Sequence, residues 1–355
     1  MKEEKFSIIK PRDRYVPSFA EVTRAGSEYV YYGTDNKFPQ YLWGLYLKSP
    51  ILSSIINGTA DFVYAGGIEW NPDLFIAKDP DYVNLEGDTL NDVIRKIITD
   101  YLIFGGYILK VCRNAKYEIV DISWLDMQNF RLNDEETMCY YYPKGFKYPE
   151  LREEYPLFDE YNPYLTSVFY YRGHISRSHY PIPKYVGALP SIETSTEIAK
   201  FHLRNIKNNF ASSYIINYNN ADFSEEQKSE IKQGITENFT GADNAGKFML
   251  AFNTSKENAV TIEKLPEDNF DKKFEALKDS TMKDIYQSFS AYPQLFGHSE
   301  ENKGFSKVEF LEAAGVYYKM SCKPLQADIK RSIDTIFGKG AMSFIDITFD
   351  DINFT

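Results

Sequence analysis

Two long helical patterns that enclose a short insert constrain the fold more strongly than any other feature of the sequence. Between residues 191 and 210, apolar residues recur at helical spacing and charged residues line another face. A second pattern of this kind covers residues 267–292, and Pro293 is expected to end it. The residues between them, 212–265, contain strand-like runs and one helical stretch. The sequence therefore predicts a compact insert carried by two long helices.

A third helical pattern follows a polar segment, GHSEENKG, at residues 297–304. Ser306 and Glu309 have the spacing of a capping box and predict where this helix begins. Pro324 lies inside the pattern and is expected to kink the helix, because proline lacks the backbone N–H and its ring crowds the preceding turn. The last run, residues 343–354, alternates apolar and polar residues and predicts a strand.

The first half of the chain mixes helical and strand patterns. A helix is expected over residues 38–65, closed by two glycines, and another over residues 90–104. Two strand-like runs, 107–113 and 117–122, follow the second helix and predict a hairpin. Residues 133–183 are rich in Tyr and Pro, and irregular or edge structure is expected there, with a strand-like run, SVFYYRG (167–173), near the end. The whole chain is therefore expected to have an α+β fold.

Charge and aromatic content restrict the partners that the chain can have. A net charge of −11 opposes tight wrapping by nucleic acid, which depends on clustered Lys and Arg, but it is compatible with DNA that slides past. The 28 Tyr and 26 Phe suit either large subunit interfaces or aromatic-rich cores. With 355 residues, the chain is long enough for two or three structural units.

The cysteines and the apolar runs indicate the compartment. The three cysteines form no C-x-x-C pair, so buried reduced thiols are expected in place of disulfides or a zinc site. The opening MKEEKFSIIK lacks the apolar core of a signal peptide, and the sequence has no apolar run long enough to cross a membrane. We therefore expect a soluble intracellular protein without a membrane partner.

Two motifs invite a chemical interpretation. The run GADNAGKF has the glycine and lysine spacing of a phosphate-binding loop, but Phe248 replaces the hydroxyl residue that would hold Mg²⁺. A helical pattern precedes this run and a strand pattern follows it, the reverse of the order that points a helix N-terminus at a phosphate. His174 and His179 have no third ligand nearby in the sequence. The sequence predicts no catalytic, cofactor or metal site and no enzyme.

The order helix, insert, helix, loop, kinked helix resembles the portal family of tailed bacteriophages. Several short motifs carry this resemblance: FGGYILKV (104–111), KNNFASSY (207–214), the run from SEEQ to KFML (224–250), Pro293 with Gly297, and Ser306 with Pro324. The resemblance implies a portal-type α+β subunit of a twelve-membered ring, with no visible helical crown at the end of the chain.

The resemblance also implies a division of the chain. Its segments are the N-terminal part of the wing (1–186), the first stem helix (187–211), an α/β clip (212–265), the second stem helix (266–293), the tunnel loop (294–305), and the long kinked helix with a C-terminal wing strand (306–355).

Three groups of site residues follow from this division. The DNA-facing tunnel loop would comprise His298, Ser299, Glu300, Glu301, Asn302 and Lys303. The clip would dock the packaging motor and the adaptor through Glu225, Glu226, Lys228 and Lys232. The charged stripe of the first stem helix, with Lys200, Arg204 and Lys207, suits either a self-stabilised exposed face or a contact between neighbouring copies.

The function implied is that of a channel at one capsid vertex through which DNA is packaged and ejected. The expected partners are double-stranded DNA, the terminase large subunit, a tail adaptor and the major capsid protein, with no cofactor. The expected location is the virion, after assembly in the host cytoplasm. Two alternatives are a head-completion or capsid-associated structural protein without a channel, and a hydrolase whose residues meet only in space.

Overall fold

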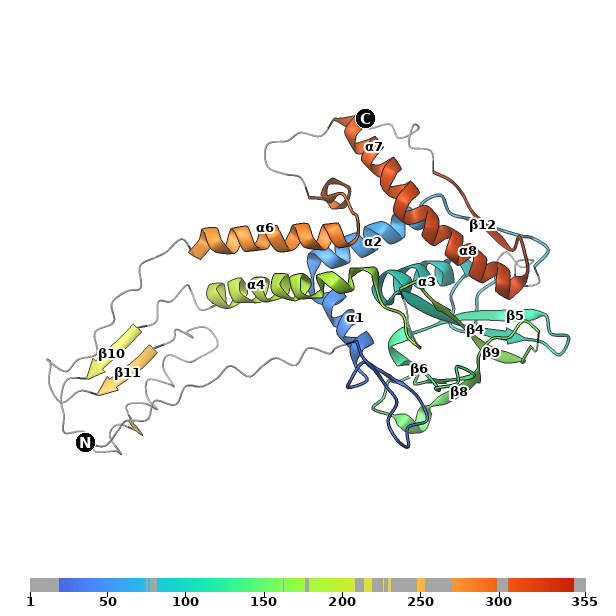
Figure 1. The fold of residues 1–355 in the computed structure, drawn as a ribbon, viewed down its shortest axis with the longest axis horizontal. Helices are drawn as coiled ribbons and strands as arrows, with labels where there is room; N and C mark the ends of the chain where they lie inside the picture. Colours follow the sequence, from blue (N-terminus) through green and yellow to red (C-terminus); the bar gives the residue numbers. More distant parts are fainter. Residues whose placement is uncertain are drawn as a thin grey trace. The chain divides into compact units, whose positions relative to one another are not determined.

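The computed structural model describes residues 19–74, 76, 82–161, 163–175, 179–207, 214–218, 226, 229–230, 248–252, 270–298 and 306–347 (Figure 1). The chain divides into two compact units. The first comprises Met1–Ala188 and Tyr286–Thr355, and the second comprises Leu189–Ile285.

Helices α1 (Phe38–Lys48) and α2 (Pro50–Tyr64) begin the helical part of the first unit. Ser49 separates them in an extended conformation, and its side chain accepts a hydrogen bond from the backbone N–H of Leu52 at 3.3 Å. The predicted single helix over residues 38–65 is therefore wrong. A proline disfavours helical geometry in the residue before it, and it fits well as the first residue of a new helix.

Helix α3 (Leu90–Phe104) forms as predicted. The Thr89 hydroxyl accepts from the Asp92 N–H at 3.2 Å, and Asp92 accepts in return from the Thr89 N–H at 3.0 Å, which completes a capping box. Gly105 ends the helix with φ +84°, a left-handed conformation that favours glycine.

The helix leads directly into a three-stranded antiparallel sheet. Strand β4 (Gly106–Arg113) lies between β5 (Ile119–Leu125) and β9 (Thr166–Arg172). The hairpin of β4 and β5 confirms the sequence prediction, with Ile108 opposite Leu125.

Residues 133–183 are more regular than predicted, because they contribute to a second antiparallel sheet. Its strands are β6 (Phe130–Leu132), β7 (Met138–Tyr141) and β8 (Glu153–Pro156). Asn133 closes the turn between β6 and β7 by accepting from the N–H groups of Thr137 and Met138, both at 2.9 Å.

Short elements complete the first unit. The paired strands are β1 (Glu21–Val22) with β2 (Tyr31–Tyr32), and β3 (Ile68–Trp70) with β12 (Met342–Phe344). The short 3₁₀ helices are Met127–Asn129, Pro149–Leu151, Lys184–Ala188 and Pro293–Phe296. Strand β12 covers the beginning of the predicted terminal strand, and residues 348–355 lie outside the described part of the chain.

The C-terminal helical segment runs as α7 (Lys307–Tyr317), a π-helical turn (Tyr318–Cys322) and α8 (Lys323–Phe337). In place of the predicted kink, the structure shows a π-helical turn directly before Pro324, which occupies the beginning of α8. The wider π turn suits this place because Pro324 cannot donate a hydrogen bond to the preceding turn.

Buried hydrogen bonds join this segment to α2. The hydroxyl groups of Thr59 and Tyr317 lie 2.6 Å apart, and Gln326 Nε2 donates to the Val63 carbonyl at 2.7 Å.

The second unit contains helix α4 (Leu189–Lys207) and strands β10 (Tyr214–Tyr218) and β11 (Phe248–Phe252). It also contains most of helix α6 (Phe270–Ser288). The two strands pair in parallel. The long helices agree with the sequence patterns, but α6 ends at Ser288, before the predicted residue 292. Ser290 has φ +51° and leaves the helical conformation. Of the predicted insert helix, the structure describes Glu226, Ser229 and Glu230, and all three are helical. The predicted third insert strand lies outside the described residues.

Candidate functional site

Helices α4 and α6 lie side by side in the second unit (Figure 1). Ser191, near the start of α4, donates through its hydroxyl to the Asp284 carboxylate, near the end of α6, at 3.0 Å. Ile192 and Ile198 of α4 are buried. Towards the other end of the pair, Phe201 and Leu203 stay exposed. Two helices alone therefore leave apolar side chains uncovered at that end.

The three charged residues predicted for the first stem helix all belong to α4. Lys200 is partly exposed, and its Nζ lies 2.8 Å from Glu197 Oε1 of the same helix. The side chains of Arg204 and Lys207 lie outside the described part of the structure. The ion pair of Lys200 fits a self-stabilised face. It does not exclude a contact between copies, so both interpretations of the stripe stay open.

The residues predicted for the clip are only partly described. Glu226 is exposed, whereas Glu225, Lys228 and Lys232 lie outside the described residues, as does the glycine and lysine run before Phe248. Phe248 is the first residue of strand β11, so a strand does follow this run. That order differs from the strand, loop, helix order of a phosphate-binding loop.

The predicted tunnel loop has two anchored ends. At its start, the carbonyl of the buried Phe296 accepts from the Ser54 hydroxyl at 3.1 Å, and Gly297 turns the chain with φ +80°. At its end, Ser306 and Glu309 form the predicted capping box, with the Glu309 N–H donating to the Ser306 hydroxyl at 3.2 Å. His298 is partly exposed. Ser299, Glu300, Glu301, Asn302 and Lys303 lie outside the described residues.

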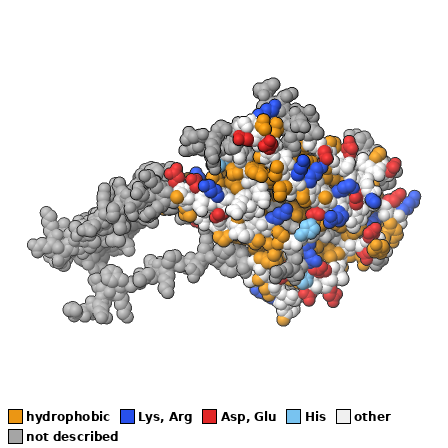
Figure 2. Space-filling view, turned by 45° about the horizontal axis from the view of Figure 1, so that its top comes forward, with side chains coloured by type: hydrophobic (Ala, Val, Ile, Leu, Met, Phe, Trp, Pro, Cys, Tyr) orange, Lys and Arg blue, Asp and Glu red, His pale blue; other side chains and the backbone are white. Residues whose placement is uncertain are grey.

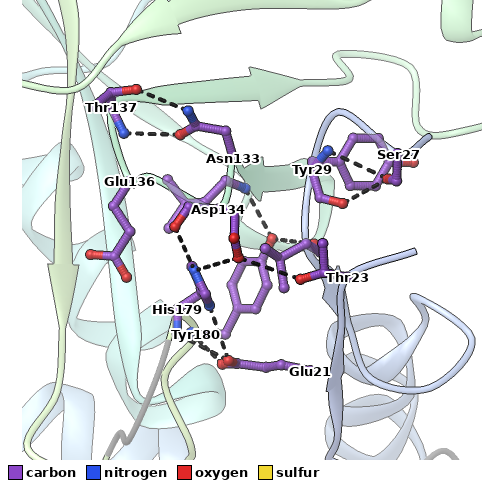
Figure 3. A network of polar contacts seen from close by, with 12 residues as sticks. Glu21, Thr23, Ser27, Tyr29, Asn133, Asp134, Glu136, Thr137, His179 and Tyr180 are labelled. Atoms are coloured by element: carbon purple, nitrogen blue, oxygen red, sulfur yellow. Dashed lines mark hydrogen bonds and ion pairs between the residues drawn. The ribbon is translucent and has the colours of Figure 1, made fainter. Parts of the chain in front are cut away.

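The two histidines lie in separate polar contacts. His174 Nε2 is 3.2 Å from Asp328 Oδ2. His179 lies between Glu21 and Asp134 (Figure 3), with Nδ1 3.2 Å from Glu21 Oε2 and Nε2 3.0 Å from the Asp134 carbonyl. Within the described residues, no group of three His, Cys, Asp or Glu side chains could hold a metal ion.

Glu21 ties strand β1 to the segment around His179. Its carboxylate accepts from the N–H of His179 at 3.1 Å and from the N–H of Tyr180 at 2.7 Å (Figure 3). Partial burial lowers the pKa of His179, but the hydrogen bonds to Asp134 and Glu21 outweigh this effect and raise it above its ordinary value. This clamp escaped sequence reasoning because the partners are far apart in the chain.

A buried carboxyl, Asp100, also escaped sequence reasoning. Burial raises its pKa well above the ordinary value, and the nearby Asp126 adds to this effect. The indole N–H of Trp124 donates to Asp100 at 2.8 Å. This bond ties helix α3 to strand β5, so the carboxyl has a structural role.

The described helices do not include one with both the length and the hydropathy of a membrane span.

Comparisons with known proteins identify the family. The sequence model of the phage portal protein family matches residues 86–353, most of the chain. No curated protein matches the sequence significantly.

Solved structures of low sequence identity share the fold. A chain from the neck of an empty gene transfer agent particle, computed with C6 symmetry, has a TM-score of 0.56 at 15% identity, covering 86% of this chain and 83% of that one. A chain from the neck of the native particle, computed with C12 symmetry, has a TM-score of 0.54 at 14% identity and the same coverage of both chains. An HK97-family phage portal protein from Corynebacterium diphtheriae has a TM-score of 0.51 at 11% identity, covering 84% of this chain and 92% of that one.

The matches confirm the predicted α+β fold and the predicted portal function, and they give no support to a head-completion protein without a channel. The chain therefore belongs to the phage portal protein family.

Proposed function

We propose that the protein assembles into a closed ring of twelve identical subunits at one vertex of the virion capsid and conducts double-stranded DNA. The observation that carries this proposal is the pair of long helices, α4 and α6, on either side of the inserted strands β10 and β11, within a chain of the portal family. The C6 and C12 symmetries of the related neck structures support a ring.

In this proposal the helix pair forms the stem. The exposed Phe201 and Leu203 of α4, together with Leu277 of α6, are then covered by neighbouring copies. Lys200, Arg204 and Lys207 lie on the same helix and contribute complementary contacts between copies. A monomer would leave these apolar side chains in water.

The segment between Gly297 and Ser306 forms the tunnel loop. In the ring, the loops of all subunits together surround the DNA. Each loop has anchored ends and a polar middle. The excess of acidic residues keeps the DNA mobile, because the channel wall repels the phosphate groups. Single basic side chains such as Lys303 contact the DNA only transiently.

The clip, residues 212–265, docks the terminase large subunit during packaging and a tail adaptor afterwards, and the wing contacts the major capsid protein. A small module held between two long helices is accessible to such partners. The protein itself catalyses no bond-making step, and the external motor supplies the energy. Assembly begins in the host cytoplasm.

Two measurements test the ring: electron microscopy of the purified protein, and its molecular mass in solution. We expect particles with a central opening and a mass of several subunits. A strictly monomeric protein at high concentration, without rings in phage heads, would contradict the proposal.

A further inference from the structure

A tyrosine projects from the loop between β8 and β9. The Tyr161 side chain is 92% exposed, and the two residues before it, Asp159 and Glu160, are exposed as well. The Asp159 carboxylate accepts from the Tyr161 N–H at 2.8 Å and so shapes the tip of the loop. We call these three residues the Tyr161 knob. An aromatic side chain with so little cover, next to two carboxylates, suits a partner with an apolar cavity and a basic rim.

The base of this loop is held firmly. The Arg113 guanidinium donates to the Tyr164 carbonyl at 3.0 Å and lies over the Phe158 ring, 4.7 Å from its centroid. The Arg113 N–H donates to the Leu165 carbonyl at 2.7 Å. The residues at the base of the knob are therefore fixed before binding, which reduces the entropy that they would lose on binding.

A cavity of about 270 Å³ lies at the other end of strand β9, among the ends of α3 and β9 and the start of α8. Its apolar lining includes Tyr101, Ile182, Phe289 and Leu325. Cavities of ~150 Å³ already bind benzene in proteins, so a phenol ring fits this one. We call it the β9 socket.

One wall of the socket is fixed by two glycines in close contact. The Gly173 N–H donates to the Gly105 carbonyl at 2.9 Å. A Cβ atom on Gly173 would lie only 2.4 Å from that carbonyl oxygen, so no larger residue fits there without a backbone shift.

The charges of the socket complement those of the knob. Lys184 and Arg331 line it and are exposed, while Asp328 is buried within it. The Asp328 carboxylate is 3.3 Å from Arg331 and 3.2 Å from His174, so its charge is compensated locally. The rim therefore retains positive charge, which favours Asp159 and Glu160 of an incoming loop. Asp328 also offers an acceptor to a phenol O–H. Figure 2 shows Lys and Arg side chains dispersed among large apolar areas on one face of the molecule.

Knob and socket lie at opposite ends of one sheet. In the pairing of β4 with β9, Cys112 lies opposite Thr166 at the knob end, and Gly106 lies opposite Arg172 at the socket end. A strand of this length separates them by roughly 20 Å. A contact between opposite ends is heterologous: it repeats from copy to copy, and it closes into a ring when the rotation between copies permits.

We propose that the Tyr161 knob of one copy inserts into the β9 socket of the next copy around the ring. The partner is thus a second copy of this chain. The inference rests on the proposed ring, and it specifies an interface in the first structural unit, separate from the helix pair.

Cross-linking tests the contact. Glu160→Cys and Ala327→Cys place one thiol beside the knob and one in the socket wall, where Ala327 is exposed. Treated with a short bismaleimide, the double variant should give a ladder of dimers, trimers and larger species. Each single variant is a control and also reports any reaction of the native cysteines, of which Cys139 and Cys322 are buried.

Charge exchange provides an independent measurement. Glu160→Arg and Arg331→Glu should each raise the protein concentration needed for half-assembly by about tenfold, and the two together should restore it. Glu150→Arg, on an exposed turn elsewhere, should leave assembly unchanged. If wild-type rings form but the double-cysteine variant gives no ladder, or neither reversal shifts assembly, this contact is disproved while the ring stands. If the wild type forms no ring, the contact and the proposed function both fail.

Discussion

Arg131 is a fully buried cation held mainly by carbonyl and amide oxygens. Its guanidinium donates to the side chain of Asn36, to the Asn36 carbonyl at 2.7 Å and to the Gln128 carbonyl at 3.0 Å. It also lies over the Phe146 ring, 4.5 Å from the centroid. These contacts tie strand β6 to the segment before α1.

Replacing Arg131 with Met should therefore be costly. The variant removes the donor for the partly buried carbonyls of Asn36 and Gln128, and we expect it to lower the free energy of unfolding by about 3 kcal/mol. Arg95→Met is the control, because Arg95 and its partner Asp61 are both largely exposed, and it should cost less than about 1 kcal/mol. Urea denaturation of both variants measures the difference. Equal losses would show that the Arg131 network contributes no more than a surface ion pair.

The clamp of Glu21 and His179 makes stability depend on pH. The pKa of His179 is raised in the folded protein, so its contribution is complete below the ordinary histidine pKa and is lost as pH rises through the folded value. The wild type should therefore lose more stability than His179→Gln between about pH 6 and pH 8. Unfolding curves at several pH values compare the two proteins. Parallel pH profiles would contradict the role given to His179.

At the level of elements, local signals in the sequence predicted the end of α3 and the start of α7, but they did not predict the break at Ser49 or the early end of α6 at Ser288. The capping box of Ser306 and the left-handed Gly105 were both recognisable from neighbouring residues. The break at Ser49 was missed because the apolar pattern continues across it. The strand β8 was missed because its pairing with β7 depends on a turn and not on its own composition.

The capping box at the start of α3 should have a measurable effect. Thr89→Ala removes the acceptor for the Asp92 N–H, and we expect it to lower the free energy of unfolding by about 1 kcal/mol. Thr99→Ala is a control at a partly exposed position of the same helix, where the Thr99 hydroxyl donates only to the Arg95 carbonyl of the preceding turn and alanine is the better helix former. Thermal unfolding of both variants gives the comparison. A loss for Thr99→Ala as large as that for Thr89→Ala would argue against the cap.

At the scale of the whole molecule, the family could be predicted from the order of helices and short motifs, but the knob and the socket could not. The socket joins Gly105, Gly173 and Leu325, which come together only after folding. The exposure of Tyr161 likewise depends on how β8 and β9 are placed. Composition indicated large aromatic interfaces or cores without locating either.

The tunnel loop gives a prediction for the assembled particle. Deleting Ser299 to Asn302 should permit rings and heads to form, because both anchored ends remain, but the heads should retain less DNA. Lys303→Ala should have a milder effect, since a single phosphate contact contributes little among many. The DNA content of purified particles, compared with the ring yield, measures both. Full-length DNA held stably by the deletion variant would contradict the gating role.

The parallel pairing of β10 with β11 has a consequence for the order of folding. A parallel pair cannot close through a tight turn, so Tyr214 meets Phe248 only after the whole stretch 219–247 has been synthesised and its ends brought together. Bringing the two strands together costs entropy before any hydrogen bond between them can offset that loss. On the ribosome β10 therefore stays without its partner strand until β11 has been synthesised.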